Sequence, residues 1–142
     1  MSSKVTMTWV KDMLFDANVN GHHLLMDADP EWGGQDQGPR PKPLLLAALS
    51  GCTGMDVVSM LEKMHVADYS FSMDLEAEPT TEHPIIYHTI TVKYLFQGND
   101  LPQDKIIKAV KLSSERYCGV SAMLQKSSNL VFKVFINDLE VM

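Results

Sequence analysis

The stretch PKPLLLAALSGCTGMDVVSMLEKM, residues 41–64, contains the longest helical pattern in the chain. Its prolines suit a first helical turn, and residues 44–64 are mostly good helix formers with Lys63 near the end. The first half is apolar on every side, which predicts a helix enclosed by other structure rather than one lying on a surface. We therefore place a long enclosed helix at residues 44–64 and build the fold outward from it.

Cys52, in the middle of this helix, has two interpretations. Free cysteine is among the most buried residue types, so Cys52 is either core filling or a reactive thiol. The positions that share its helix face are mostly apolar: Leu45, Ala48, Leu49, Met55, Asp56 and Ser59. Apolar burial raises a thiol pKa, so a reactive Cys52 needs a cation brought from elsewhere in the chain.

Three neighbours of Cys52 in this helix are unusual for an enclosed apolar segment. Asp56 stands one turn after Cys52, where its negative charge opposes a thiolate unless a cation such as Arg40, Lys42 or Arg116 pairs with it. Gly51 and Gly54 are poor helix formers. The two glycines indicate either tight helix packing or close approach by another backbone or a substrate.

The only two arginines of the chain each stand close in sequence to one part of a possible thiol site. Arg40 precedes the Cys52 helix, and Arg116 precedes Cys118, the second cysteine. Glu115 and Ser121 flank Cys118 at helical spacing. Cys118 ends a helix beside a glycine, so it is either accessible or buried at the helix end. Sequence alone leaves open whether the two thiols face each other.

The segment before the long helix predicts a small β-sheet. Val5, Met7 and Trp9 alternate with threonines, the pattern of a half-buried strand. Residues 13–19 and 22–27 form two further strands, joined by the tight-turn signal Asn-Gly. Residues 28–43, rich in Gly, Pro, Asp and Gln, must be a loop, and a loop of this length is often functional.

The segment after the long helix predicts a second sheet with helices. Residues 67–78 alternate apolar and polar side chains, and residues 85–96 are rich in β-branched and aromatic residues, so both are strands. A helix at residues 103–117, a short helix at 120–127 and a strand at 129–137 complete the chain. Adjacent strand pairs favour antiparallel pairing and an α+β class.

Composition excludes several classes of protein. With 142 residues, 45% apolar and 21% charged, the chain fits a single soluble domain, residues 1–142. A net charge of −6 without a basic patch argues against nucleic acid as a partner. The longest apolar run, residues 44–49, is far shorter than the about 20 residues that cross a bilayer. The charged start MSSKVTMTWVKD lacks the apolar core of a signal peptide, so we expect a cytoplasmic protein without membrane association.

Metal and hydrolytic chemistry have little support in the sequence. The cysteines form no CxxC pair, and in the cytoplasm two distant cysteines are poor candidates for a structural disulfide. The histidines lack metal-ligand spacing: His22, His23, His65, His83 and His88. We therefore expect neither a metal nor a cofactor.

Two motifs together resemble the OsmC/Ohr superfamily. The first is a proline-led helix of the type P-x-E-L-L-x-A-A-x-A-x-C, which residues 41–52 match up to Cys52. The second is a downstream cysteine of C-x-V-S type, matched by Cys118, Val120 and Ser121. Either motif alone is weak, whereas the pair in this order is fairly specific. The closer likeness is to the OsmC-like branch of redox proteins.

The resemblance implies an α+β fold in which two chains intertwine, with antiparallel sheets outside and two long central helices inside. It also implies a thiol peroxidase. Cys52 would attack a hydroperoxide as a thiolate and become a sulfenic acid, and Cys118 would resolve it to a disulfide. A dithiol or thiol protein would then reduce the enzyme by exchange. The implied partners are a second copy of the chain, an organic hydroperoxide and this reductant.

The chain departs from the family pattern around the thiolate. Active members hold it with an arginine from the N-terminal strands and a glutamate just after the leading proline, where this chain has Lys42 and Pro43. Arg40, Lys42 or Arg116 are the candidate replacement cations, with Asp56 and Glu115 as the nearby carboxylates. The leading hypothesis is a thiol-dependent peroxidase; the alternatives are a small-molecule binding or sensing dimer and a structural oligomer with inert cysteines.

Overall fold

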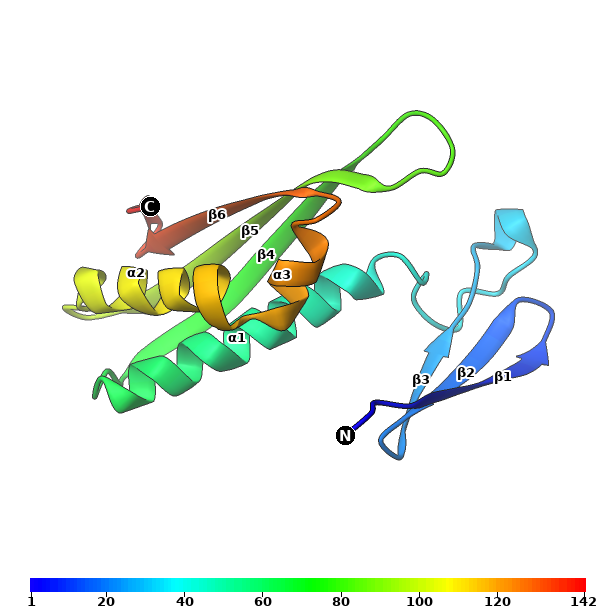
Figure 1. Ribbon diagram of the computed structural model, residues 1–142, viewed down its shortest axis with the longest axis horizontal. Helices are drawn as coiled ribbons and strands as arrows, with labels where there is room; N and C mark the ends of the chain where they lie inside the picture. Colours follow the sequence, from blue (N-terminus) through cyan, green and yellow to red (C-terminus); the bar gives the residue numbers. More distant parts are fainter. The chain divides into compact units, whose positions relative to one another are not determined.

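The computed structural model describes residues 1–142 and has an α+β architecture (Figure 1). The chain forms two compact units, Met1–Ala47 and Ala48–Met142. The long helix α1 (Leu44–Lys63) begins at the end of the first unit and lies mostly in the second. The expected α+β class and the position of the expected long helix are thereby confirmed, whereas the helix is not enclosed on every side within one chain.

The first unit contains an antiparallel sheet of three strands, β1 (Val5–Lys11), β2 (Leu14–Val19) and β3 (His22–Met26), in that order. Asn20 and Gly21 join β2 to β3 with φ of 53° and 82°. Positive φ at both central residues defines the tight turn that matches strand twist, and Asn-Gly tolerates it best. The expected hairpin is therefore confirmed.

The outer strand β1 is more exposed than the half-buried strand that its alternating pattern predicts. Val5, Met7 and Trp9 are 56%, 47% and 63% exposed, so the alternating pattern buries none of them within the chain. The first unit consists of a sheet and a loop, with no second layer of its own against this strand. Exposed apolar side chains that gather on one strand are typical of an interaction surface.

The loop after β3 is ordered by one carboxylate. Asp27 is 4% exposed and accepts hydrogen bonds from the backbone N–H groups of Ala28, Gln35 and Gln37. Burial raises the pKa of Asp27, but these hydrogen bonds outweigh it and hold the pKa below its usual range. The loop also contains a short helical turn, η1 (Pro30–Trp32).

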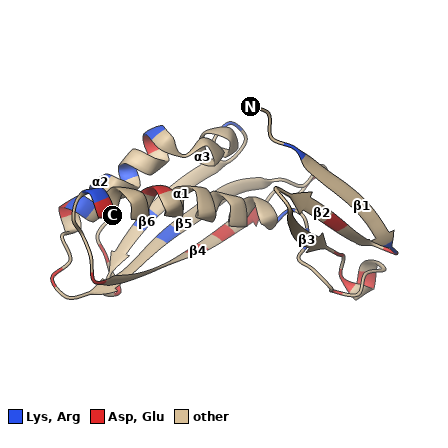
Figure 2. Ribbon diagram, turned by 90° about the horizontal axis from the view of Figure 1, so that it is seen from below, with Lys and Arg blue, Asp and Glu red and all other residues tan.

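The second unit pairs a four-stranded sheet with helices on one face (Figures 1 and 2). The strands, in spatial order, are β4 (Tyr69–Pro79), β5 (Tyr87–Gly98), β6 (Asn129–Ile136) and β7 (Leu139–Glu140). The helices after β5 are α2 (Gln103–Leu112), the π-helical turn η2 (Ser113–Tyr117) and α3 (Gly119–Leu124). The helix expected at residues 103–117 thus changes character at Ser113.

One strand pairing corrects the expectation of antiparallel sheets. β4 and β5 are antiparallel, but β5 and β6 are parallel, with Thr89 opposite Asn129 and Phe96 opposite Ile136. The connection from β5 to β6 runs through α2, η2 and α3. A helical crossover brings the chain back to the end of the sheet at which β5 begins. The next strand, β6, therefore runs in the same direction as β5.

The core of the second unit lies between the sheet and the helices. β5 buries Ile90, Val92, Tyr94 and Phe96. Only one stripe of α1 is buried within the chain: Leu49, Thr53, Val57 and Leu61. Elsewhere on α1, Met55 and Val58 are 76% and 44% exposed. By length and composition alone α1 is long and apolar enough to cross a membrane, a test that core helices of soluble proteins also pass.

Candidate functional site: a pair of neighbouring thiols

The two cysteines lie on different elements of the second unit. Cys52 is in the middle of α1 and half-buried, and the next residue, Thr53, faces the core. Cys118 is 4% exposed and caps the N-terminus of α3, directly after the η2 turn. Both are free thiols.

The fold brings these two thiols together. Cys52 lies close enough to Cys118 to change the pKa of its thiol. Burial raises the pKa of Cys118, and negative charge on Cys52 raises it further, because two adjacent thiolates repel. Burial and the neighbouring cysteine therefore both disfavour the thiolate form of Cys118.

Ser121 is the polar partner of Cys118. Its backbone N–H donates to the Cys118 sulfur over 3.4 Å. The Ser121 hydroxyl is fully buried and makes no hydrogen bond. The proximity of Ser121 lowers the pKa of Cys118 and partly offsets the effect of burial on the thiol.

A chain of buried hydroxyl groups runs beside the thiol pair. The Thr53 hydroxyl lies 2.7 Å from the Tyr94 hydroxyl and 2.7 Å from that of Ser113. The Ser113 hydroxyl donates to the Asp56 carboxylate over 2.8 Å. We refer to Tyr94, Thr53, Ser113 and Asp56 as the hydroxyl chain.

The Asp56 carboxylate sets the direction of every bond in the hydroxyl chain. An ionised carboxylate only accepts, so the single Ser113 proton is committed to it. Ser113 must then accept from Thr53, and Thr53 must accept from Tyr94. Burial raises the pKa of Tyr94 to about 12, which keeps its donating proton in place at neutral pH.

Asp56 therefore has a different partner from the cations considered above. Its carboxylate is bound by the Ser113 hydroxyl, from a residue 57 positions further along the chain. A neutral donor holds the carboxylate in place without adding a positive charge. The hydrogen bond between Asp56 and Ser113 thus connects α1 with η2.

Arg40 forms its ion pairs inside the loop of the first unit. Its guanidinium lies 2.7 Å from the Asp36 carboxylate and 3.4 Å from that of Asp29. The hydrogen bond to Asp36 raises the pKa of Arg40 above its usual value. Two carboxylates thus share this cation, which weakens the field it offers to any third group.

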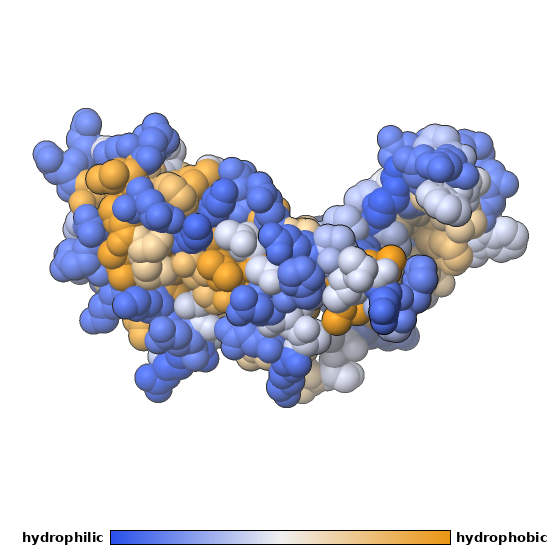
Figure 3. Space-filling model, turned by 90° about the horizontal axis from the view of Figure 1, so that it is seen from above, coloured by the Kyte–Doolittle hydropathy of each residue, from blue (hydrophilic) through white to orange (hydrophobic).

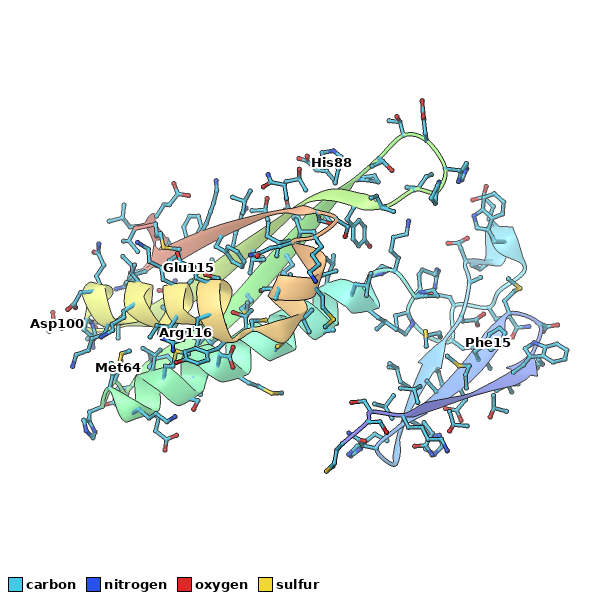
Figure 4. The ribbon with its side chains drawn as sticks, in the orientation of Figure 1. Phe15, Met64, His88, Asp100, Glu115 and Arg116 are labelled. Carbon is cyan, nitrogen blue, oxygen red and sulfur yellow. The ribbon has the colours of Figure 1, made fainter.

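The other candidate side chains lie near the cysteines in sequence and at the surface. Arg116 and Glu115 are exposed residues of η2, labelled in Figure 4. The Arg116 guanidinium lies over the Tyr117 ring, 5.3 Å from its centroid, which is a cation–π contact. Lys42 is exposed in the turn that precedes α1.

The two glycines near Cys52 have different surroundings. A methyl group added at Gly54 would lie 3.3 Å from the Met73 sulfur on β4, so this glycine permits close packing of helix on sheet. At Gly51 nothing lies within 4 Å of the same position. Tight packing therefore explains Gly54, while Gly51 leaves open space directly beside Cys52.

A cavity of about 590 Å³ lies between α1, α2 and η2 on the Asp56 side of the helix. Its lining combines apolar side chains with two lysines and one carboxylate: Asp56, Ser59, Met60, Lys63, Met64, Lys108, Leu112 and Tyr117. Mostly apolar walls with a few polar groups are typical of small-molecule sites.

Sequence reasoning missed three members of the hydroxyl chain. Tyr94 and Thr53 occupy buried positions of a strand and a helix that pattern alone assigns to the core. Ser113 begins the π-helical turn, a feature that is frequent at functional sites. The signal in the sequence that could have indicated Ser113 was the pair of adjacent serines, Ser113 and Ser114, inside an expected helix.

The fold and the thiol pair define an OsmC-type protein. Residues 34–133 match the family model described as OsmC-like protein, and the chain belongs to this family. It is 33% identical over 123 residues to protein YhfA of Escherichia coli strain K12, covering 86% of this chain and 89% of that protein.

Solved structures have the same fold. A hypothetical protein from Aquifex aeolicus VF5 superposes with a TM-score of 0.85 at 27% identity, covering 96% of this chain and 97% of the other. The organic hydroperoxide resistance protein OhrB of Bacillus subtilis superposes with a TM-score of 0.64 at 15% identity, covering 95% and 98%. The resemblance inferred from the two cysteine motifs is thereby confirmed.

Proposed function

We propose that the protein is a thiol-dependent peroxidase that reduces organic hydroperoxides through Cys52 and Cys118. The observation that carries this proposal is the proximity of the half-buried Cys52 to the buried Cys118, close enough that charge on the first raises the pKa of the second. Family membership supports a redox role, and OhrB of Bacillus subtilis is an organic hydroperoxide resistance protein by name.

The reaction would proceed in three balanced steps. The Cys52 thiolate attacks the terminal oxygen of the hydroperoxide, the O–O bond breaks, and the alkoxide takes a proton and leaves as the alcohol. Cys118 then attacks the sulfenic sulfur of Cys52, forming the disulfide and releasing water. A dithiol reductant attacks the disulfide and leaves as its own disulfide, restoring both thiols.

The direct test is to treat the reduced protein with one equivalent of cumene hydroperoxide. We expect mass spectrometry to show loss of two hydrogen atoms and a peptide pair linking Cys52 to Cys118. A protein whose two thiols remain free, with no sulfenic acid on Cys52 after dimedone trapping, would contradict the peroxidase proposal. The double variant Cys52→Ser, Cys118→Ser is the matched control, because it lacks both thiols and keeps side chains of similar size.

A second candidate function is a small-molecule binding or sensing dimer without turnover. It is favoured by the absence of the family glutamate at Lys42-Pro43 and by the commitment of Arg40 to two carboxylates. Under this alternative, cumene hydroperoxide would be consumed once and not again in the presence of a dithiol. Sustained turnover would exclude it.

We also propose that the protein is a cytoplasmic homodimer. The apolar residues Met55 and Val58 of α1 and Trp9 of β1 remain exposed within one chain. Figure 3 shows apolar side chains among hydrophilic ones on one face of the second unit. Clustered exposed apolar side chains are typical of an interface.

Light scattering is expected to give a mass of two 15.9 kDa chains. Replacing Met55 and Val58 together with glutamate should shift the protein to the mass of one chain, because two buried charges oppose association. Ser72→Glu, on an exposed position of β4, is the control. A single-chain mass for the unmodified protein would contradict the dimer.

A further inference from the structure

Ser113 forms hydrogen bonds through both its side chain and its backbone to groups around the thiol pair. Its hydroxyl donates to Asp56 over 2.8 Å and lies 2.7 Å from the Thr53 hydroxyl, both on α1. Its backbone carbonyl accepts the N–H of Cys118 over 2.8 Å. Thr53 follows Cys52 directly. One buried residue therefore ties Cys118 to the part of α1 that holds Cys52.

The burial and charge of these contacts make the connection stiff. Thr53, Tyr94 and Ser113 are each 0% exposed, so water cannot replace a bond that breaks. The bond from Ser113 to Asp56 is charge-assisted, which makes it stronger than a bond between neutral groups. The Tyr94 proton is committed to Thr53, so the chain has one direction and no free donor.

A disulfide forms only within a narrow range of geometry, so a stiff connection between Cys118 and α1 would favour it. Two cysteines can be bridged only when their Cα atoms lie within about 4.4–6.8 Å and the side chains meet at the right torsion. Cys118 directly follows η2, a π-helical turn whose path differs from that of the preceding α2. Without an anchor, this turn would let Cys118 move relative to α1.

We propose that Ser113 is a positioning residue that holds Cys118 in bonding register with Cys52, and that Asp56 fixes Ser113 in this role. The inference deepens the proposed function, on which it rests for the identity of the redox pair. It predicts that Ser113 governs how readily the disulfide forms, while the attack of Cys52 on a peroxide depends on it much less.

The test measures the disulfide equilibrium in glutathione buffers, without any peroxide. The reduced protein and glutathione disulfide exchange to give the Cys52–Cys118 disulfide and two glutathione molecules, and the oxidised fraction gives the equilibrium constant. We expect Ser113→Ala to lower this constant roughly tenfold or more, the effect of losing a charge-assisted hydrogen bond. Ser113→Thr keeps the hydroxyl and should restore most of it.

Ser114→Ala is the matched control. Ser114 belongs to the same turn and is nearly buried, but its hydroxyl donates only to the Lys111 carbonyl of the adjoining helix. We expect its equilibrium constant to stay within about twofold of the unmodified protein, since a local helix bond contributes little. An equal loss in Ser114→Ala and Ser113→Ala would overturn the proposal in favour of general loosening of η2.

A second variant keeps the test decisive if Ser113→Ala does not fold. Asp56→Asn removes the charge with almost no change in volume, and it should lower the same constant by a smaller factor. Unchanged constants in every folded variant would overturn the positioning role. A protein that forms the disulfide with glutathione in a Ser113-dependent way, yet ignores cumene hydroperoxide, would contradict the peroxidase and support the positioning role.

Discussion

Replacing Cys52 with serine is expected to reduce hydroperoxide consumption to the rate of protein-free buffer. A serine hydroxyl at neutral pH has no anionic form to attack the O–O bond, so the first step is lost. Cys118→Ser is expected to behave differently: Cys52 still reacts once and then remains a sulfenic acid. Because Cys118 is 4% exposed and its thiol pKa is raised by burial, it cannot take over the role of Cys52.

The two variants are compared by peroxide consumption and by dimedone trapping of sulfenic acid. The unmodified protein should turn over in the presence of a dithiol, Cys118→Ser should be trapped on Cys52, and Cys52→Ser should show neither. The opposite pattern, with sulfenic acid on Cys118 and activity in Cys52→Ser, would reverse the assignment of the attacking and resolving thiols.

The second large effect is a loss of stability in alkaline solution that traces to Tyr94. The pKa of Tyr94 is about 12 in the folded protein, compared with 10.0 for the unperturbed phenol. The contribution of this raised pKa to the free energy of unfolding is fully present below pH 10. Between pH 10 and 12 the unfolded chain releases the phenol proton while the folded chain keeps it, so the free energy of unfolding falls as pH rises. The loss approaches about 2–3 kcal/mol near pH 12, at about 1.4 kcal/mol for each pKa unit.

Urea unfolding followed by circular dichroism at several pH values between 8 and 12 measures this loss. Burial also raises the pKa of Tyr69 and Tyr87, so the decisive quantity is the difference between the unmodified protein and Tyr94→Phe. At pH 8 the variant should be less stable by about 1 kcal/mol, because Thr53 loses a hydrogen-bond donor. Two curves that stay parallel up to pH 12 would show that Tyr94 does not carry the effect.

Local pattern was sufficient for most of the secondary structure. The alternation around β4, the Asn-Gly turn before β3 and the proline-led helix α1 each depend on residues close in sequence, and each was predicted to within a few positions. The two cysteine motifs were sufficient to identify the family. Each places a cysteine at a defined position of a helix, and the two motifs occur in a fixed order along the chain. The helix expected up to Tyr117 does extend to that residue, but its last turn is π-helical rather than α-helical.

What the sequence by itself determined is thus the order of the elements, the α+β class and the identity of the two thiols. The tertiary structure alone decided the parallel pairing of β5 with β6 and the placement of Cys118 beside Cys52. It also decided the partner of Asp56. The bonds of Thr53 to Tyr94 and Ser113 span 41 and 60 positions of the chain. Periodicity reports which face of an element is apolar, whereas the meeting of distant polar groups depends on how the elements pack, and packing has no local pattern.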